Sequence, residues 1–478
     1  MESNKTIMGT TRESKRSSFR WFVVSLMFIA ILFNYADREI WVILEPAFAH
    51  AFGWYTGPLS NYSTSAVAVG NVSMVLFIWG LVYAIMNFPG GWITDKLGLR
   101  KAMTIMFGIW STFTILTSVT FNFLSMVIVR AFMGAGEGPV WPINSKITKN
   151  WSSRFDESKT FTFAGVGQSF GPIVGLVAGA AIYAAIGWKL TFVVFGALGL
   201  VLTAVWYIFM RDLPSENKYV NESELEYIEE GKPKSANIET KKLSAASSWR
   251  ITAKIVFGTQ AGWGILLTYL AYGYMLYSFL YYLPPLMFAT FAHTVSSSAI
   301  YSALIDVGLV IGFITGGLVN DYLVKRYNKV TARRMGGVLP MIGALIMVGL
   351  SYFTGSAHEL VPTAVLLAVA AFFMQSTSGS YSLNAVDIAP SGTSATVYGV
   401  YNGLLNLVGA FSAIIEGYLF IHASPEIAFT SMTLFMAMFI GGYIGLIRKS
   451  TWQKALDYGS RLLDSETQQS KEMENNVR

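Results

Sequence analysis

The stretch RAFMGAGEGPVWP, Arg130–Pro142, lies inside a long apolar segment at roughly residues 124–147. Arg130 and Glu137 are seven positions apart, so a helix with 3.6 residues per turn places both on one face. Either charge at a bilayer centre costs about 2.5–3.5 kcal/mol on insertion scales, and such groups mostly face a wet cavity or each other. Glycine and alanine beside them allow close approach by a helix or a ligand. Pro139 can bend the helix just past the carboxylate.

The composition of the whole chain is that of a membrane protein. Of its 478 residues, 53% are hydrophobic and 13% are charged, and the mean hydropathy is +0.48. The absence of cysteine excludes disulfides and cysteine metal sites, and the four histidines show no ligand spacing, so no metal site is expected. The N-terminus is polar and basic, and the apolar run after it ends in charges, so we expect no cleavable signal. The net charge of +6 could suggest nucleic acid, but loop residues that anchor membrane helices explain it better, and we expect no nucleic-acid partner.

Hydropathy and loop charge predict the topology. About twelve apolar segments can be marked, at roughly 21–44, 69–93, 102–121, 124–147, 161–186, 191–210, 256–287, 297–320, 336–354, 361–385, 397–420 and 426–447. Lys and Arg fill the termini and alternate loops, whereas the other loops contain only Lys189. By the positive-inside rule both termini are cytoplasmic and the number of spans is even. We therefore expect tails at 1–20 and 448–478, bundles at 21–210 and 256–447, and a cytoplasmic linker at 211–255.

A repeated motif indicates that the two halves are related. Gly90–Asp95 reads GGWITD and Gly316–Asp321 reads GGLVND, and basic residues follow both. Two six-helix halves joined by a cytoplasmic loop are typical of a secondary transporter built from parallel repeats. We interpret the motif as a gating element made of Gly90, Asp95, Arg100, Gly317 and Asp321. Its glycines allow tight helix crossing, and its aspartate can cap a helix or pair with a basic residue such as Arg100.

The first segment carries a second charged group, formed by Asn34, Asp37 and Arg38. With Arg130 and Glu137 it supplies two cations and two carboxylates that can neutralise one another. An arriving carboxylate substrate would need an arginine, which suits bidentate recognition. Freeing that arginine while its acidic partner is protonated would link proton binding to substrate binding. The alternative is a buried ion-pair network that only fixes helix packing.

Other polar residues could complete a pocket for a hydroxylated ligand. They are Tyr83 and Asn87 in segment two, Gln168 in segment five, Tyr274 in segment seven, Ser376 in segment ten and Asn402 in segment eleven. Each could equally form a hydrogen bond that packs two helices. Asp306 lies well inside segment eight, where it is either a second proton site, a cation contact or a salt-bridged structural residue.

These motifs resemble those of the major facilitator superfamily, and within it the anion:cation symporter family. That family includes bacterial sugar-acid transporters and is related to animal sialic acid and vesicular glutamate transporters. The resemblance covers most of the chain and is most specific at Arg130–Trp151, with further support from Phe33–Arg38 and Phe77–Lys101. Weaker matches are LYYLPP, AVDIAP and YGVYNGLLNLVG, at 280–285, 385–390 and 398–409.

The resemblance implies an all-α membrane fold of about twelve helices in two six-helix bundles, and proton-coupled uptake of an organic anion by alternating access. It implies that Arg38 binds the substrate carboxylate, that Asp37 and Glu137 carry protons and that Arg130 organises Glu137. Substrate hydroxyls would contact Tyr83, Gln168 and Asn402. The sequence departs from the family at Asn87, Gly273 and Asp306, where we expect Gln, Asn and an uncharged residue; these departures concern the choice of substrate.

We therefore predict a monomeric plasma-membrane symporter of a sugar acid, such as a hexonate or hexuronate, with no cofactor besides the coupling proton. Small dicarboxylates and aromatic acids remain alternative substrates. A sodium-coupled or exchange transporter is the nearest alternative function. A membrane enzyme would need a nucleophile or metal set, but the chain has no HExxH, no GxSxG and no cysteine. A non-transporting receptor would need a signalling domain, which nothing in the chain resembles.

Overall fold

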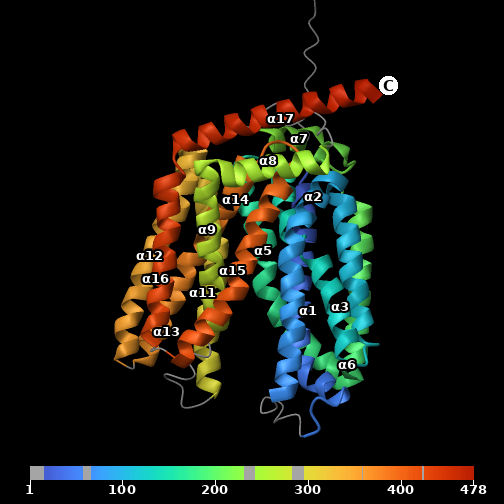
Figure 1. Cartoon of the computed structure of the whole chain (residues 1–478), viewed down its shortest axis with the longest axis vertical. Coiled ribbons are helices and arrows are strands. Elements are labelled where there is room, and N and C mark those ends of the chain that lie inside the picture. Colours follow the sequence, from blue (N-terminus) through green and yellow to red (C-terminus); the bar gives the residue numbers. More distant parts are fainter. Residues whose placement is uncertain are drawn as a thin grey trace, which may run out of the picture.

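The computed structural model describes residues 16–57, 66–230, 243–282, 295–357, 359–422 and 425–477, and every regular element in these ranges is a helix (Figure 1). The first half contains α1 (Phe19–Ala51), α2 (Ala66–Thr117), α3 (Phe123–Glu137), α4 (Val140–Trp151), α5 (Glu157–Gly165) and α6 (Gly167–Phe209). A linker follows, with η2 (Pro214–Glu216), α7 (Glu222–Glu229) and α8 (Ala245–Gly258).

The second half has the same all-helical character. It contains α9 (Gln260–Tyr277), η4 (Ser278–Tyr282), α11 (Val295–Arg326), α12 (Lys329–Ser356), α13 (Leu360–Ser376), α14 (Ser378–Ile388), α15 (Ser394–His422), α16 (Pro425–Gly441) and η5 (Gly442–Leu446). The last helix, α17 (Lys449–Val477), turns by 74° from the preceding one and lies with α7 and α8 across one end of the molecule (Figure 1, top). We call this end the linker face.

Eight helical stretches in the described ranges are long and apolar enough to cross a membrane. Two of them each contain two of the predicted segments, because α2 breaks at Gly98 and α6 breaks at Gly187. Both glycines have a positive φ, 82° and 77°, which a residue with a side chain adopts only at a cost. The predicted all-α membrane fold is confirmed. The end of the segment predicted at 256–287 lies outside the described residues from 283 onward.

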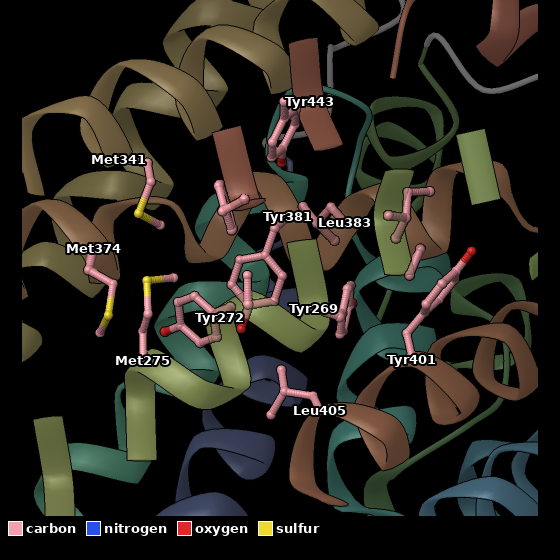
Figure 2. Packing of buried hydrophobic residues seen from close by; sticks show 14 of the residues in the cluster. Tyr269, Tyr272, Met275, Met341, Met374, Tyr381, Leu383, Tyr401, Leu405 and Tyr443 are labelled. Atoms are coloured by element: carbon pink, nitrogen blue, oxygen red, sulfur yellow. The ribbon is translucent and has the colours of Figure 1, made fainter. Parts of the chain in front are cut away.

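Each half has its own apolar core. The core of the first half draws its residues from Val23 to Met210, and the core of the second half is rich in tyrosine and methionine (Figure 2). In the second half the ring of Tyr381 lies 4.1 Å from that of Tyr272 and 5.0 Å from that of Tyr269. The Tyr272 hydroxyl donates to Gln375, so this aromatic centre also satisfies its polar atoms.

A row of glycines on α6 sets the position of α1, the helix that carries the charged group of the first segment. Gly167, Gly171 and Gly175 lie directly against the backbone of α1. A Cβ atom added at Gly171 would lie 2.5 Å from the Leu32 carbonyl oxygen and 2.6 Å from the Tyr35 Cβ. The close contact is therefore between backbones, and no side-chain rotation could relieve a substitution.

Replacing Gly171 with alanine is expected to lower the apparent Tm of the purified protein in detergent, because α6 must move away from α1. Overpacking of this kind costs roughly 1–3 kcal/mol. Gly349→Ala is the matched control, since nothing lies within 4 Å of a Cβ added to that helical glycine. Equal Tm values for the two variants in a thermal-unfolding assay would contradict the described packing.

The linker is anchored to the first half by a charged cluster at the start of α1. The Glu224 carboxylate of α7 accepts hydrogen bonds from the backbone N–H groups of Phe19 and Arg20, at 3.0 and 3.1 Å, and so caps α1. Burial alone would raise the pKa of the nearby Asp156 carboxyl, but the Tyr227 hydroxyl and the positive charge of Lys159 hold that pKa below its usual value.

The two copies of the glycine–aspartate motif make equivalent contacts between the halves at the linker face. Asp95 accepts from the N–H groups of Ala395 and Thr396, at 3.3 and 2.7 Å, and so caps α15 of the second half. Asp321 accepts from the N–H groups of Ser158 and Lys159, at 2.9 and 2.7 Å, and so caps α5 of the first half. Each half therefore holds a helix N-terminus of the other.

The structure corrects one detail of the predicted gating motif. Asp95 pairs with Lys146 at 3.2 Å and not with Arg100, whose Nε donates to the Tyr207 carbonyl oxygen at 2.7 Å. The reason is the break at Gly98, which turns the chain between Asp95 and Arg100. Gly90 and Gly317 occupy tight crossings, against Pro139 and Thr162 respectively, as the motif predicted.

A buried ion-pair cluster adds to this junction between the halves. Glu157 of α5 lies 2.6 Å from Lys329 and 3.0 Å from Arg333, both of α12. The same two cations contact Asp387 of α14, at 2.6 and 3.1 Å. The hydrogen bonds and ion pairs recorded between described residues of the two halves all lie at the linker face or near Asn87, closer to the centre.

Candidate functional site

The candidate site is the charged group in the middle of the first half, where α1 meets α3. Glu137 stands at the last position of α3, immediately before the Gly138-Pro139 break that precedes α4. Its Oε2 lies 3.5 Å from the Nε of Arg38 on α1. The Glu137 side chain is completely buried, while that of Arg38 is 20% exposed. The pair therefore joins an inaccessible acid to an arginine that a solute can reach.

Aromatic rings surround the Arg38 guanidinium. Its central carbon lies 4.3 Å from the ring centre of Tyr35, 4.7 Å from that of Tyr83 and 4.8 Å from that of Trp79. Its Nη2 donates to the Asn34 side-chain oxygen at 2.9 Å. Cation–π contacts of this type are favourable where water is scarce, and they orient the flat guanidinium. Arg38 is thus held in one direction without losing all of its donors.

Asp37 lies beside this pair but points into the first-half core. It is 2% exposed, and its Oδ2 accepts from the indole N–H of Trp110 at 2.5 Å and from the Thr114 hydroxyl at 3.4 Å. Its Oδ1 is buried and has no hydrogen-bond partner among the described residues. Two carboxylates therefore lie in the dry part of the site with different partners, Glu137 on an arginine and Asp37 on an indole.

Arg130 is completely buried and is stabilised mainly by aromatic and sulfur contacts. Its guanidinium lies 4.2 Å from the Trp41 ring centre and 5.6 Å from that of Trp79, and its Nη1 donates to the Met133 sulfur at 3.0 Å. Within the described part of the chain, neither carboxylate forms an ion pair with it, although both act on it electrostatically. The Trp79 ring therefore contacts both Arg38 and Arg130.

A chain of amides connects the first half to the second near the centre. The Asn402 amide donates to the Asn87 side-chain oxygen at 2.7 Å, and Asn87 donates to the Tyr83 carbonyl at 2.9 Å. Asn406 donates to the Asn402 carbonyl and accepts from the Tyr277 hydroxyl. Tyr83, Asn87 and Asn402 are thus joined by hydrogen bonds, and the Tyr83 ring contacts Arg38. Gln168 is half-buried on α6, beside the glycines that contact α1.

Three other predicted residues lie elsewhere. The Tyr274 hydroxyl bonds Ser431, and its ring stacks on Phe435 at 3.8 Å, so it joins α9 to α16 within the second half. The Ser376 hydroxyl donates to the Phe372 carbonyl one turn earlier. Asp306 is on an exposed face of α11, and no ion pair or hydrogen bond to the charged group is recorded in the described ranges. Tyr274 therefore packs two helices together and Ser376 bonds its own helix, which the same sequence pattern also permits.

The sequence reasoning missed the tryptophans of the site. Trp41 contacts Arg130, and Trp79 contacts both Arg38 and Arg130. Trp110 donates a hydrogen bond to Asp37. Trp41 follows Asp37 by four residues and Trp79 precedes Tyr83 by four, so helical spacing could have suggested both. Nothing in the sequence marks Trp110, because an aromatic residue in an apolar segment is ordinarily part of the core.

The helical fold with two motif-linked halves and a charged centre was compared with known families. Residues 27–413 match the model of the Major Facilitator Superfamily. The chain belongs to this family. It is therefore a multi-pass membrane transporter and not an enzyme, and the predicted fold of two helical bundles is confirmed.

Curated relatives of this superfamily member include bacterial transporters. A probable sulfoacetate transporter of Cupriavidus necator is 27% identical over 85% of this chain and 88% of its own length. The hexuronate transporter of Bacillus subtilis is 24% identical over 83% and 87%. A probable galactarate/D-glucarate transporter of Escherichia coli is 26% identical over 90% and 96%. The predicted resemblance to bacterial sugar-acid transporters is thus confirmed.

Solved structures of the superfamily share the fold. The fucose:proton symporter of Escherichia coli superimposes with a TM-score of 0.61 at 14% identity, over 89% of this chain and 98% of that one. A proton:xylose symporter superimposes with a TM-score of 0.66 at 15% identity, over 90% and 97%. At these identities the likeness concerns the fold alone.

Proposed function

We propose that this transporter carries a sugar acid together with protons by alternating access. The observation that carries the proposal is the ion pair between Arg38, which a solute can reach, and Glu137, which is completely buried. A carboxylate that enters the site competes with Glu137 for the same guanidinium. Protonation of Glu137 removes that competition, so substrate and proton bind together.

The charge balance follows from this competition. Both the empty site and the site with a monovalent anion and one proton contain the same net charge, because the anion replaces the charge that Glu137 loses. A proton that moves inward down a potential of 100 mV supplies about 2.3 kcal/mol per net charge. One proton with one monoanion would therefore be electrically neutral, and Asp37 could carry a second proton that makes uptake depend on the potential.

Sugar acids fit the groups around Arg38. The guanidinium supplies a bidentate partner for a carboxylate, and the amides of Asn87 and Asn402 and the hydroxyl of Tyr83 can exchange hydrogen bonds with sugar hydroxyls. The names of the relatives support hexuronates and the diacids galactarate and D-glucarate as candidates. Gln168, half-buried on the neighbouring helix, could extend the polar side of this pocket.

Alternating access is supported by the junction between the halves. We assign the linker face to the cytoplasm, because the basic loops at 95–101, 146–159 and 325–334, the start of α1 and helix α17 lie at this face. We also assign the protein to the plasma membrane. The caps at Asp95 and Asp321 and the Glu157 ion pairs then close the cytoplasmic side. The described state corresponds to access from outside, and inward release would require these contacts to open.

Uptake into proteoliposomes tests the proposed function. Purified protein is exposed to labelled hexonates, hexuronates and aldarates with an imposed inward proton gradient, an inward sodium gradient or internal counter-substrate. We expect accumulation of at least one sugar acid with the proton gradient alone, and alkalinisation outside as it enters. Accumulation that requires sodium or internal substrate would instead support cation-coupled symport or exchange on the same fold.

The cap at Asp95 provides a prediction for the gate. Asp95→Ala removes the acceptor of two α15 N–H groups, and loss of such a cap costs about 0.5–2 kcal/mol. The closed state should lose roughly 2- to 30-fold in population against the open one. The chain has no cysteine, so a single cysteine introduced as Phe88→Cys is the only thiol that a reagent can label. Phe88 lies where α2 contacts Gly403 of the second half, and a reagent added at the linker side can reach this position when the gate opens. We expect faster labelling by a membrane-impermeant thiol reagent.

Asp212→Ala is the matched control for this measurement. Asp212 also accepts a backbone N–H at the linker face, from Arg100 at 2.9 Å, but this bond joins the linker to the first half and does not reach the second half. If Asp95→Ala and Asp212→Ala change the labelling rate equally, the cap on α15 does not hold the gate.

A further inference from the structure

The indole of Trp110 makes the shortest recorded hydrogen bond to either carboxylate of the site, although Trp110 itself cannot touch a substrate. Its N–H donates to Asp37 Oδ2 at 2.5 Å, and its side chain is completely buried in the first-half core. The Thr114 hydroxyl, one turn further along α2, reaches the same oxygen at 3.4 Å. The donors thus gather on Oδ2, whereas Oδ1 has no hydrogen-bond partner among the described residues.

The surroundings of Trp110 fix its ring in place. The ring stacks on Phe107 with a centroid distance of 4.4 Å and an angle of 14°. Its backbone lies against Gly136, where an added Cβ would come within 2.7 Å of the Trp110 nitrogen and 2.8 Å of its Cβ. Gly136 directly precedes Glu137. Trp110 therefore contacts both parts of the site, with its side chain on Asp37 and its backbone against Gly136, the residue before Glu137.

The chemistry of the two groups makes this bond directional. An indole N–H can only donate, and it keeps its bond in both protonation states of a carboxyl group if it faces the oxygen that stays unprotonated. A proton on Oδ1 leaves Oδ2 as a carbonyl-type acceptor, whereas a proton on Oδ2 would weaken the acceptor that Trp110 and Thr114 share. The arrangement therefore favours one of two oxygens as the proton site.

We infer that Trp110 is a positioning residue for proton coupling, which holds Asp37 Oδ2 in both protonation states and directs the transported proton to Oδ1. This inference rests on the proposed function, because it requires Asp37 to carry a proton. The charged groups that act on Asp37 from the packed helices are Glu137 and Arg130, both on α3. Neither donates a recorded hydrogen bond to Asp37, so Trp110 and Thr114 alone orient the carboxyl group within the described residues.

Trp110→Phe in the full-length protein tests the inference, because it keeps an aromatic ring and removes only the N–H. Hydrogen bonds to an ionised acceptor are about twice as strong as those to a neutral one, so losing the donor destabilises the ionised form more. We expect the pH of half-maximal proton-driven uptake to rise by about half to one unit. Counterflow exchange of the transported sugar acid, measured at fixed pH, should stay within about twofold of wild type, since it needs no net proton release.

Trp206→Phe is the matched control. Trp206 is a buried tryptophan of the same half, on α6, and its indole nitrogen has no hydrogen-bond partner in the described part of the chain. The control should show neither the pH shift nor a change in counterflow. An identical pH profile for the two variants, or an equal loss of counterflow and uptake in Trp110→Phe, would overturn the inference.

Two further measurements keep the inference separate from the proposed function and from folding. If Asp37→Asn still accumulates substrate with a proton gradient, Asp37 does not carry the coupling proton. If Asp37→Asn loses accumulation but Trp110→Phe has the same pH profile as Trp206→Phe, Asp37 keeps its role and only the inference about Trp110 is rejected. If Trp110→Phe does not fold, the infrared C=O band of protonated Asp37 in the wild-type protein tests the inference. This band is assigned by its loss in Asp37→Asn. A band typical of a carboxyl that accepts a hydrogen bond supports the inference, and a band typical of a free one overturns it.

Discussion

Replacement of Arg38 by lysine will raise the KM for the transported anion by about 30- to 700-fold, or abolish uptake at accessible concentrations. Losing a bidentate, charge-assisted contact in a largely desolvated site costs about 2–4 kcal/mol, and each 1.4 kcal/mol is tenfold. Lysine keeps the charge, but it loses the flat guanidinium that the rings of Tyr35, Trp79 and Tyr83 orient. It also cannot bind Asn34 and a carboxylate in the same fork-shaped geometry.

Initial rates of uptake and equilibrium binding together check this expectation. Arg100→Lys serves as the matched control, because Arg100 also stacks on a tyrosine, at 4.1 Å from the Tyr207 ring centre, but at the linker face. The control should change KM by less than threefold. A KM for Arg38→Lys within threefold of wild type would mean that the substrate carboxylate binds elsewhere.

The sequence predicted the fold because a bilayer imposes strong rules on each segment separately. The apolar length of a segment, the charge of a loop and the repeated glycine–aspartate motif can each be interpreted without knowing which helices are neighbours. The partners of the charges depend on how helices turn against one another, which no single segment specifies. Arg130 and Glu137 share a helix face, yet seven residues at about 1.5 Å each separate them by about 10 Å. Glu137 therefore pairs with Arg38 of another helix.

Polar residues inside helices were the harder part of the site to predict. A serine or tyrosine that lines a cavity and one that bonds a neighbouring helix occupy the same positions in a sequence. Ser376 donates to its own helix at Phe372, and Tyr274 reaches Ser431, whereas Asn402 crosses to the first half. A residue of the central site can be distinguished from a helix-packing residue only by its contacts with the other half, which lies far away in the sequence. Trp110 could not be predicted from the sequence because it reads as an ordinary apolar core residue, and its role depends on a single N–H group.

Replacement of Glu137 by glutamine is expected to abolish accumulation driven by a proton gradient while it preserves exchange of the same anion. Glutamine resembles the protonated acid in size and charge, so Arg38 is permanently free of its 3.5 Å partner. Substrate can then bind and cross without a proton on this site, and the accumulation ratio should fall from the wild-type value to about one. For the same reason, binding of the anion should become less dependent on pH than in wild type.

Paired measurements of net uptake and counterflow separate this outcome from simple damage to the protein. Glu39→Gln is the control, because Glu39 is a half-buried acid on α1 that lies against Gly175 of α6, outside the charged group. It should accumulate substrate as wild type does. If Glu137→Gln still concentrates the anion, protons do not couple through this acid, and its pair with Arg38 serves packing. If it loses exchange as well, Glu137 is needed to form the site, because removing its charge leaves one carboxylate fewer to offset the charges of Arg130 and Arg38.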